Sequence, residues 1–426
     1  MKKLTLLIVT LFVIAFVAYA QETKNDEWKF TGAAQIRPEL DGRDFCNQTY
    51  PPTYTSMRLR FGVEKTLWDK VTFFAQFQDS RIFGEPGNTV KSLKNTDLHQ
   101  GYVILNNIFE LPISAQAGRF EMSYGTTRLF GTNSWNYIAR SYDGLRFTLK
   151  TEPLKLDVFS LTHTASNGYL SPKPETYQYP AVNDNSQSIY GFYASFPNFI
   201  DGNTIDLTGF YDFNGKKSDS INHDLERFTA GLTYFLKIEN FSATAEFDYQ
   251  FGKYQGLDVA AYLALLTLQY KIEPITMSAN IDILSGTKPT ENEKLNSFDP
   301  TYGTKHSYNG FMDYFSNTFQ STNNLGLNDF YLSFIFKMKD SPLSIQLDGH
   351  YFLTNQKSAS DLNDIGQEID LVVKYNIVKG ASIEWGASAF LPGDLMKEFW
   401  NEGLTKDNYT RKDAALWSYV MLRVDL

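Results

Sequence analysis

The chain of 426 residues carries a formal net charge of −9, and this acidic balance argues against nucleic acid as a partner. It contains 26 Tyr and 34 Phe, far more aromatic residues than a soluble domain needs, yet its mean hydropathy is only −0.32. Apolar residues are therefore diluted by polar ones, as in strands with one face in lipid and the other in water.

The first predicted element is a secretory leader. Lys2 and Lys3 are basic, Leu4 to Val17 form an apolar run, and Ala18-Tyr19-Ala20 precedes Gln21. This pattern predicts a signal peptide over residues 1–20, and loss of its two lysines would change the net charge to about −11. A membrane anchor is less favoured, because the run is shorter than the ~20 residues that a spanning helix needs. The single Cys46 excludes an intrachain disulfide framework.

Residues 21–426 show an alternation of period two along their whole length and form one predicted domain. In residues 57–63, for example, Met57, Leu59 and Phe61 alternate with two arginines and a glycine. Such segments predict an all-β fold, a transmembrane antiparallel up-and-down β-barrel of about 18 strands. The predicted strands are 27–40, 54–67, 71–82, 96–106, 113–123, 141–150, 154–164, 187–197, 203–214, 225–238, 241–253, 257–272, 275–286, 326–339, 343–354, 364–377, 381–391 and 414–426.

The predicted connections are sorted by length. Short ones follow even-numbered strands, at 68–70, 151–153, 239–240, 273–274, 340–342 and 378–380. Long ones follow odd-numbered strands, near 41–53, 83–95, 124–140, 165–186, 287–325 and 392–413. Tight turns on one rim and long loops on the other are typical of a bacterial outer-membrane barrel with both termini in the periplasm. A soluble sandwich or propeller has no reason to sort its loops in this way.

The alternation also predicts which charged side chains point into the lumen. They are mostly basic on the early strands and mostly acidic on the later ones, so one half of the wall should face a half of opposite charge. A guanidinium group on such a wall can bind a carboxylate or phosphate through two parallel hydrogen bonds. The alternative is that these charges form ion pairs with one another within the wall. The inward candidates are Arg37, Arg58, Arg60, Arg146, Arg227, Glu246, Asp248, Asp348, Asp370 and Arg423.

One stretch carries a family resemblance. Residues 118–125 read G-R-F-E-M-S-Y-G, residues 128–131 read R-L-F-G, Trp135 follows, and residues 140–147 read R-S-Y-D-G-L-R-F. This run resembles the alginate-export family of outer-membrane porins, whose pattern is G-R-x-E-x-x-Y-G, R-L-x-G, W and R-x-[FY]-D-G-x-R. The strand count fits the family's eighteen-stranded barrel.

The resemblance implies an electropositive constriction through which an anionic polysaccharide passes. Arg119 and Arg146 would be lumen arginines of that constriction, and Arg128 and Arg140 would lie on a loop that folds over or into the pore. For Arg119 the resemblance overrules the alternation, which sends its side chain outward.

Three functional hypotheses follow. The first is a porin that passes an anionic solute, an alginate-like acidic oligo- or polysaccharide, through an Arg-lined lumen. The second is a general or phosphate-type anion porin, and the third is a structural or adhesive barrel with a closed lumen. The expected partners are the outer-membrane lipid bilayer and an anionic saccharide or small anion, and a monomer is favoured.

Other chemistry has little support in the sequence. The chain has no G-x-S-x-G and no H-E-x-x-H motif, so no enzymatic activity is expected. No cofactor is expected either. The acidic turns 183–185 and 361–364 are compatible with Ca²⁺ binding, although polar loop turns explain their composition better. The aromatic 287–325 loop should fold back as a constriction or plug.

Overall fold

A computed structural model describes residues 27–85, 87, 95–164, 183–216, 224–401 and 409–426. The expected leader, residues 1–20, lies outside this part of the chain. None of the helices found in it has the length and apolarity needed to cross a membrane.

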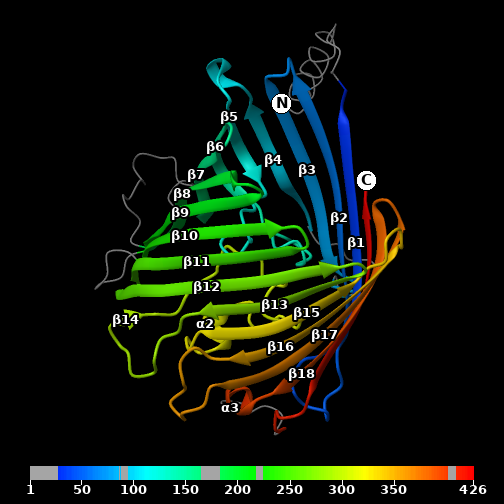
Figure 1. Cartoon of the computed structure of the whole chain (residues 1–426), viewed down its shortest axis with the longest axis vertical. Helices are drawn as coiled ribbons and strands as arrows, with labels where there is room; N and C mark the ends of the chain where they lie inside the picture. Colours follow the sequence, from blue (N-terminus) through cyan, green and yellow to red (C-terminus); the bar gives the residue numbers. More distant parts are fainter. Residues whose placement is uncertain (1–26, 86, 88–94, 165–182, 217–223, 402–408) are drawn as a thin grey trace.

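Eighteen strands close into one antiparallel barrel, which confirms the predicted fold class (Figure 1). Each pairs with the next along the chain, and β1 pairs with β19 to close the ring, with Ala33 opposite Asp425 and Gly42 opposite Leu416. The strands are β1 Lys29–Gly42, β2 Thr53–Leu67, β3 Val71–Ile82, β4 Thr96–Leu105, β5 Ile113–Phe120, β6 Tyr142–Lys150, β7 Lys155–Thr164, β8 Asn183–Ile200, β9 Asn203–Lys216, β10 Leu225–Ile238, β11 Phe241–Tyr254, β12 Leu257–Ile272, β13 Ile275–Leu284, β15 Leu327–Phe336, β16 Leu343–Leu353, β17 Asp364–Val378, β18 Ala381–Pro392 and β19 Ala415–Asp425.

Four short elements in the described part of the chain lie outside this ladder. They are β14 Lys294–Leu295, which pairs in parallel with β12, and the helices η1 Ile108–Glu110, α2 Thr318–Ser321 and α3 Asp394–Asn401. None of them was predicted, because each is shorter than the periodic window that a sequence pattern needs.

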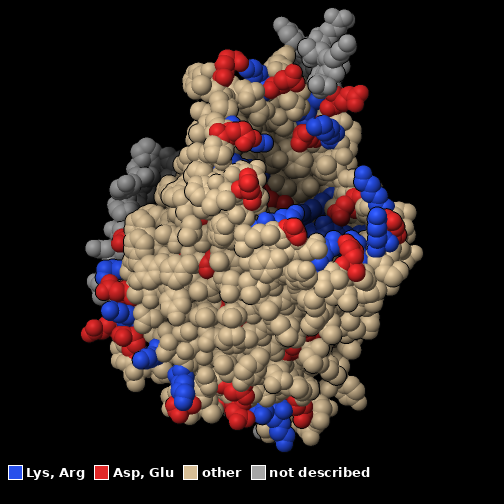
Figure 2. All heavy atoms as spheres, viewed as in Figure 1, with Lys and Arg blue, Asp and Glu red and all other residues tan. Residues whose placement is uncertain are grey.

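The two faces of the wall differ as the alternation predicts. On β2, Leu59 and Phe61 are 43% and 56% exposed on the outside, whereas Ser56 and Arg58 are buried on the inside. On the face shown in Figure 2 the outer wall is largely free of charge, and charged side chains gather at its margins and in a hollow. This distribution suits a surface in contact with hydrocarbon, where an exposed charge costs several kcal/mol.

The sorting of connections is confirmed. Short turns follow β2, β6, β10, β12, β15 and β17, while long connections follow β1, β3, β5, β13 and β18. One two-residue turn, 255–256 between β11 and β12, lies on the rim of the long loops. The last residues of the chain lie at the opposite rim, where Leu426 donates its backbone N–H to Gly32 and Asp425 to Gly380 in a short turn.

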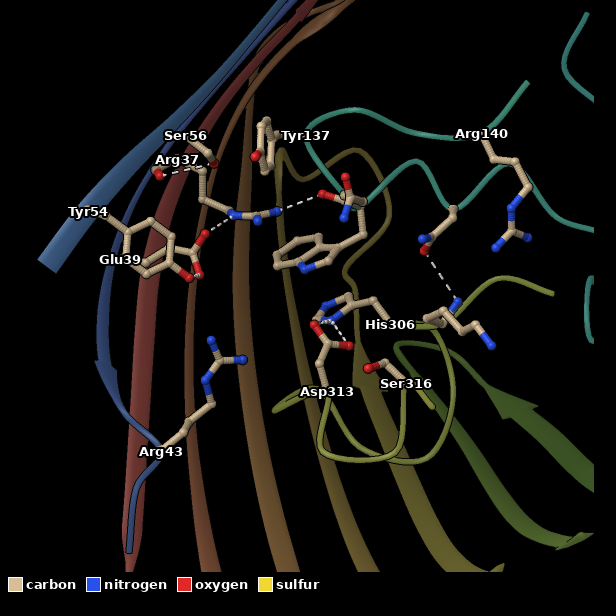
Figure 3. A pocket seen from close by; sticks show the side chains of 14 residues that line it. Arg37, Glu39, Arg43, Tyr54, Ser56, Tyr137, Arg140, His306, Asp313 and Ser316 are labelled. Atoms are coloured by element: carbon tan, nitrogen blue, oxygen red, sulfur yellow. Dashed lines mark hydrogen bonds and ion pairs between the residues drawn. The ribbon is translucent and has the colours of Figure 1, made fainter. Parts of the chain in front are cut away.

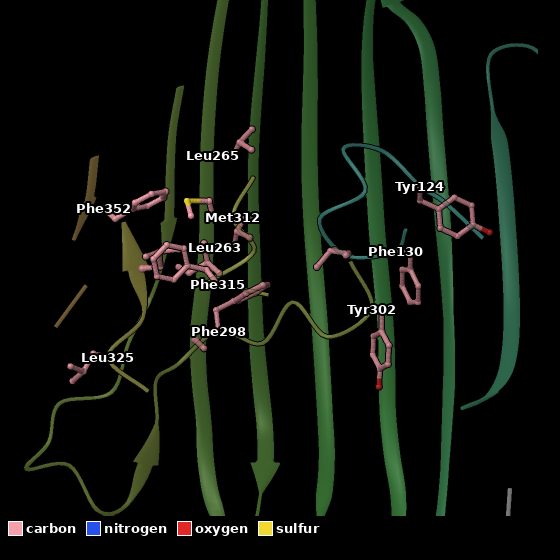
Figure 4. Packing of buried hydrophobic residues seen from close by; sticks show 14 of the residues in the cluster. Tyr124, Phe130, Leu263, Leu265, Phe298, Tyr302, Met312, Phe315, Leu325 and Phe352 are labelled. Atoms are coloured by element: carbon pink, nitrogen blue, oxygen red, sulfur yellow. The ribbon is translucent and has the colours of Figure 1, made fainter. Parts of the chain in front are cut away.

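Two long connections fold back into the barrel. We call residues 121–141 the β5–β6 loop and residues 285–326 the β13–β15 loop. Phe130 of the first stacks on Tyr302 of the second at 5.7 Å, and both rings are buried against the inner wall (Figure 4). The predicted return of the 287–325 segment is therefore confirmed. The predicted strand 113–123 ends earlier, at Phe120, because the chain turns inward and buries Met122.

Candidate functional site

Arginines of β1 and β2 bind the β5–β6 loop from the barrel wall. Arg37 donates to the carbonyl oxygen of Trp135 at 2.9 Å. Arg58 donates to the carbonyl oxygens of Ser134 and Asn136 at 3.0 and 2.9 Å. Because the two strands are adjacent and antiparallel, alternate positions bring these guanidinium groups to one side of the lumen. They position the loop that crosses the pore.

These wall arginines differ in how far their charge is compensated. Arg37 forms an ion pair with Glu39 at 2.7 Å, and Arg60 forms one with Glu121 at 3.1 Å. Arg58 has only neutral hydrogen-bond acceptors among the described residues, with Gln35 as the third. A charge held by neutral dipoles remains available to attract an anion.

Arg128 and Arg140 join the two inward loops. Arg128 is buried, forms an ion pair with Asp282 of β13, and lies 3.4 Å from the ring centroid of Tyr308. Arg140 donates to the carbonyl oxygens of residues 301–303 in the β13–β15 loop. Both arginines therefore lie on a loop that folds into the pore, and both serve as cross-links there.

The strands β5 and β6 place two of the candidate arginines on opposite faces. Arg146 points inward and donates to Gln116 at 2.5 Å. Arg119 pairs at 2.8 Å with Asp143, which lies on the same outer side of β6 as the half-exposed Phe147. The expectation that Arg119 lines the constriction is therefore wrong. The strand alternation sends its side chain outward. Gly118, the first glycine of the motif, is explained by the close approach of β5 to the neighbouring strand.

Arg227 and Arg423 differ in their electrostatic environment. Arg227 is buried between two carboxylates, with Asp212 at 2.7 Å and Asp299 at 2.8 Å. Arg423, near the rim of short turns, is half-exposed and pairs with Asp425 at 2.8 Å. The first charge is fully compensated within the protein, whereas the second faces water.

Carboxylates of the facing wall hold both inward loops. Glu246 of β11 accepts a hydrogen bond from the hydroxyl of Thr126 in the β5–β6 loop. Glu368 of β17 accepts one at 2.8 Å from the backbone N–H of Met312 in the β13–β15 loop. Each loop is thus fixed between basic groups on one side and acidic groups on the other.

The remaining acidic candidates are buried in the same wall. Asp348 accepts a hydrogen bond from Gln346 at 2.7 Å. Asp248 and Asp370 are each 1% exposed, and neither has a hydrogen-bond donor for its carboxylate oxygens among the described residues. The basic wall of β1, β2 and β6 therefore faces an acidic wall formed by β11, β16 and β17.

Three cavities follow one another through the lumen. The outer cavity, about 580 Å³, lies under the β1–β2 connection, the middle cavity measures about 400 Å³, and the inner cavity measures about 560 Å³. Arg43 and Asp313 line both the outer and the middle cavity. Trp135 and His306 line both the middle and the inner cavity. The sequence of shared linings traces a path from the rim of long loops toward the rim of short turns.

The middle cavity is the basic part of this path (Figure 3). It is lined by four basic side chains, Arg37, Arg43, Arg140 and Lys305, and by two carboxylates, Glu39 and Asp313. The ammonium group of Lys305 donates to the carbonyl oxygen of Pro300 at 3.0 Å, and burial lowers the pKa of this lysine to about 8.

Several of these residues were missed at the level of sequence. Arg43, Lys305 and His306 lie in connections, where no alternation exists to assign a direction. The aromatic content of residues 287–325 indicated a folded loop but not which side chains would reach the path. Trp135 was noted only as one letter of the family pattern.

Metal binding finds no support in the described ranges, where no group of three or more His, Cys, Asp or Glu side chains is arranged to hold an ion. Asp361, in one of the two acidic turns, pairs with Lys357 at 2.9 Å. The side chains of the other turn, residues 183–185, lie outside the described part of the chain.

Comparison with known proteins decides the family. A family profile described as "Alginate export" matches residues 28–407, which is nearly the whole chain. The chain belongs to the alginate-export family. No match was found among curated protein sequences.

Solved structures similar to this alginate-export family member share its fold, and one of them is described as an outer membrane protein. OccK11 (OpdR) of Pseudomonas aeruginosa has a TM-score of 0.58 at 9% identity, covering 94% of this chain and 96% of that one. OccAB4 of Acinetobacter baumannii has a TM-score of 0.57 at 12% identity, covering 95% and 100%. OpdK of Pseudomonas aeruginosa has a TM-score of 0.58 at 8% identity, covering 93% and 98%. The family member is therefore a porin-like barrel of the bacterial outer membrane.

Proposed function

We propose that this alginate-export family member passes an anionic solute, an acidic oligo- or polysaccharide of the alginate type, through its Arg-lined lumen. The observation that carries the proposal is the excess of basic over acidic side chains around the middle cavity. Arg140 and Lys305 carry the most weight, because among the described residues their side-chain hydrogen bonds go to carbonyl oxygens and neither forms an ion pair.

The surroundings of the cavity strengthen its attraction for anions. A narrow passage with walls of low dielectric concentrates the field of fixed charges, so a small excess of charge sets the sign of the permeating ion. Arg140 already holds two loops together, whereas the ammonium group of Lys305 makes a single hydrogen bond among the described residues and can turn toward a carboxylate. We assign Lys305 as the residue that contacts the passing anion most directly.

The proposal is tested by reversal potentials of the purified protein in planar bilayers under a KCl gradient. We expect a preference for chloride over potassium that falls toward unity in Lys305→Gln and is kept in Lys305→Arg. Uronate oligomers should block the current at concentrations where phosphate and sulfate do not.

The other outcomes separate the alternatives. Equal block by all these anions would indicate a general anion porin instead. A bilayer with inserted protein and no current steps would indicate a barrel with a closed lumen. A preference for cations in the native protein would contradict both anion hypotheses.

A further inference from the structure

The boundary between the middle and inner cavities is formed by two aromatic side chains. Trp135 and His306 line both cavities, and among the described residues the two linings have no other residue in common. Their rings are stacked, with centroids 3.7 Å apart and an angle of 4° between the planes. The two cavities therefore adjoin at this contact.

Both faces of the Trp135 indole are occupied. The guanidinium carbon of Arg37 lies 3.9 Å from the indole centroid. Two groups this close to one ring cannot share a face without overlapping, so Arg37 and His306 cover opposite faces. His306 contacts Phe311 on its other side at 5.0 Å, and the result is a stack of a cation and three rings across the lumen.

The stack is anchored at its edges. The ring of Tyr419 on β19 meets Trp135 edge-on at 4.9 Å. Nδ1 of His306 lies 3.2 Å from the carboxylate of Asp313 in the same loop. Trp135 and His306 both belong to loops rather than to the wall, so they can separate without a change in the strand ladder.

We propose that the Trp135–His306 contact is the selectivity filter of the lumen and that it favours anions carried on a ring over acyclic anions of equal charge. This inference rests on the proposed passage of anions. A solute that separates the two rings exposes one face of the indole. A pyranose ring can cover that face with its own C–H surface, while its carboxylate lies near the basic side chains that line the middle cavity. A flexible acyclic anion offers no such surface.

The test compares two probes that differ mainly in shape. Glucuronate is a pyranose and gluconate is acyclic, but both carry one carboxylate and six carbons. Permeability ratios from reversal potentials should favour glucuronate by roughly two- to tenfold, the factor expected for one aromatic contact. In Trp135→Ala the ratio should fall to about one, while the preference for chloride over potassium persists. Trp135→Phe should keep part of the ring preference.

Two further variants serve as a second test and as a control. His306→Ala should weaken the ring preference independently, so the inference does not depend on the folding of a single variant. Trp385→Ala removes an exposed indole of the outer wall and should change neither ratio. A native ratio near one, or a ring preference that survives Trp135→Ala, would overturn the filter and leave anion passage standing. If the native protein showed no preference for chloride over potassium, the proposed function itself would be overturned.

Discussion

The basic residues of this lumen differ mainly in whether their partners are carboxylates or neutral oxygens. Arg227 lies between two carboxylates, whereas Lys305 has a carbonyl oxygen as its partner. Removing one partner of a buried ion pair leaves the other charge unpaired and destabilises the fold by about 3–5 kcal/mol. Replacing Lys305 leaves no unpaired carboxylate behind, so its effect should appear in conduction rather than in stability.

The buried position of Lys305 predicts a pH-dependent selectivity. Burial lowers its pKa to about 8, so the side chain is charged at pH 7 and largely neutral at pH 9. The preference for anions should therefore decrease as the pH rises through this interval, as measured by reversal potentials. Lys305→Arg should keep its preference throughout, because an arginine stays protonated in proteins. A decrease of equal size in that variant would assign the titration to another group.

Residues on strands were predictable, and residues on connections were not. Alternation alone placed Arg37 and Arg58 on the inside, because in a closed sheet every second side chain points to the lumen. The same rule placed Arg119 outside, and the family resemblance was wrong to overrule it. No comparable rule exists for His306, whose direction depends on contacts between two loops distant in sequence.

At the scale of elements, the two inward loops share a pattern of attachment. Each is held by the first carboxylate of a Glu-x-Asp pair on the acidic wall, Glu246 for the β5–β6 loop and Glu368 for the β13–β15 loop. In each pair the second carboxylate, Asp248 or Asp370, has no hydrogen-bond donor in the described residues. The first position of each pair therefore carries the attachment.

The attachment at Glu368 can be tested by limited proteolysis of the folded protein in detergent. Glu368→Ala removes the acceptor of the Met312 N–H, and a buried N–H left without a partner costs about 1–3 kcal/mol. Cleavage within the β13–β15 loop should then become roughly ten- to a hundredfold faster.

Glu368→Gln is the matched control, since its amide oxygen still accepts the bond. It should show an intermediate rate. Equal protection in all three proteins would mean that the loop is held by its aromatic contacts alone.

Element boundaries were predictable only where the alternation continues into water. The sequence predicts a strand to residue 123, but β5 ends at Phe120 although Phe120 and Met122 keep the inward period. These two side chains belong to a buried cluster that also contains residues of the two inward loops. Periodicity reports which side of the chain is buried, and it does not report what buries it.

At the scale of the whole molecule, the barrel wall and the path through its lumen are formed by different parts of the chain. The wall is held by a closed ladder of backbone hydrogen bonds, whereas the path is shaped by two loops that enter from one rim. The ladder was fully implied by alternation and loop lengths. The path was not, because the arrangement of loops within the lumen arises from side-chain packing that leaves no periodic signal.

This separation predicts the effect of removing the β13–β15 loop. Leu284 and Leu327 are direct partners in the ladder, so a two-residue Asn-Gly turn can replace residues 285–326. The shortened protein should keep its β-sheet circular dichroism, and its single-channel conductance should rise several-fold because Trp135 loses its stacking partner. The anion preference should fall with the loss of Lys305. The equivalent replacement of residues 354–363, between the paired Leu353 and Asp364, is the control, since none of those residues lines the three cavities. If both deletions left the conductance unchanged, the β13–β15 loop would not lie on the conducting path, and the constriction would have to be sought in the β5–β6 loop alone.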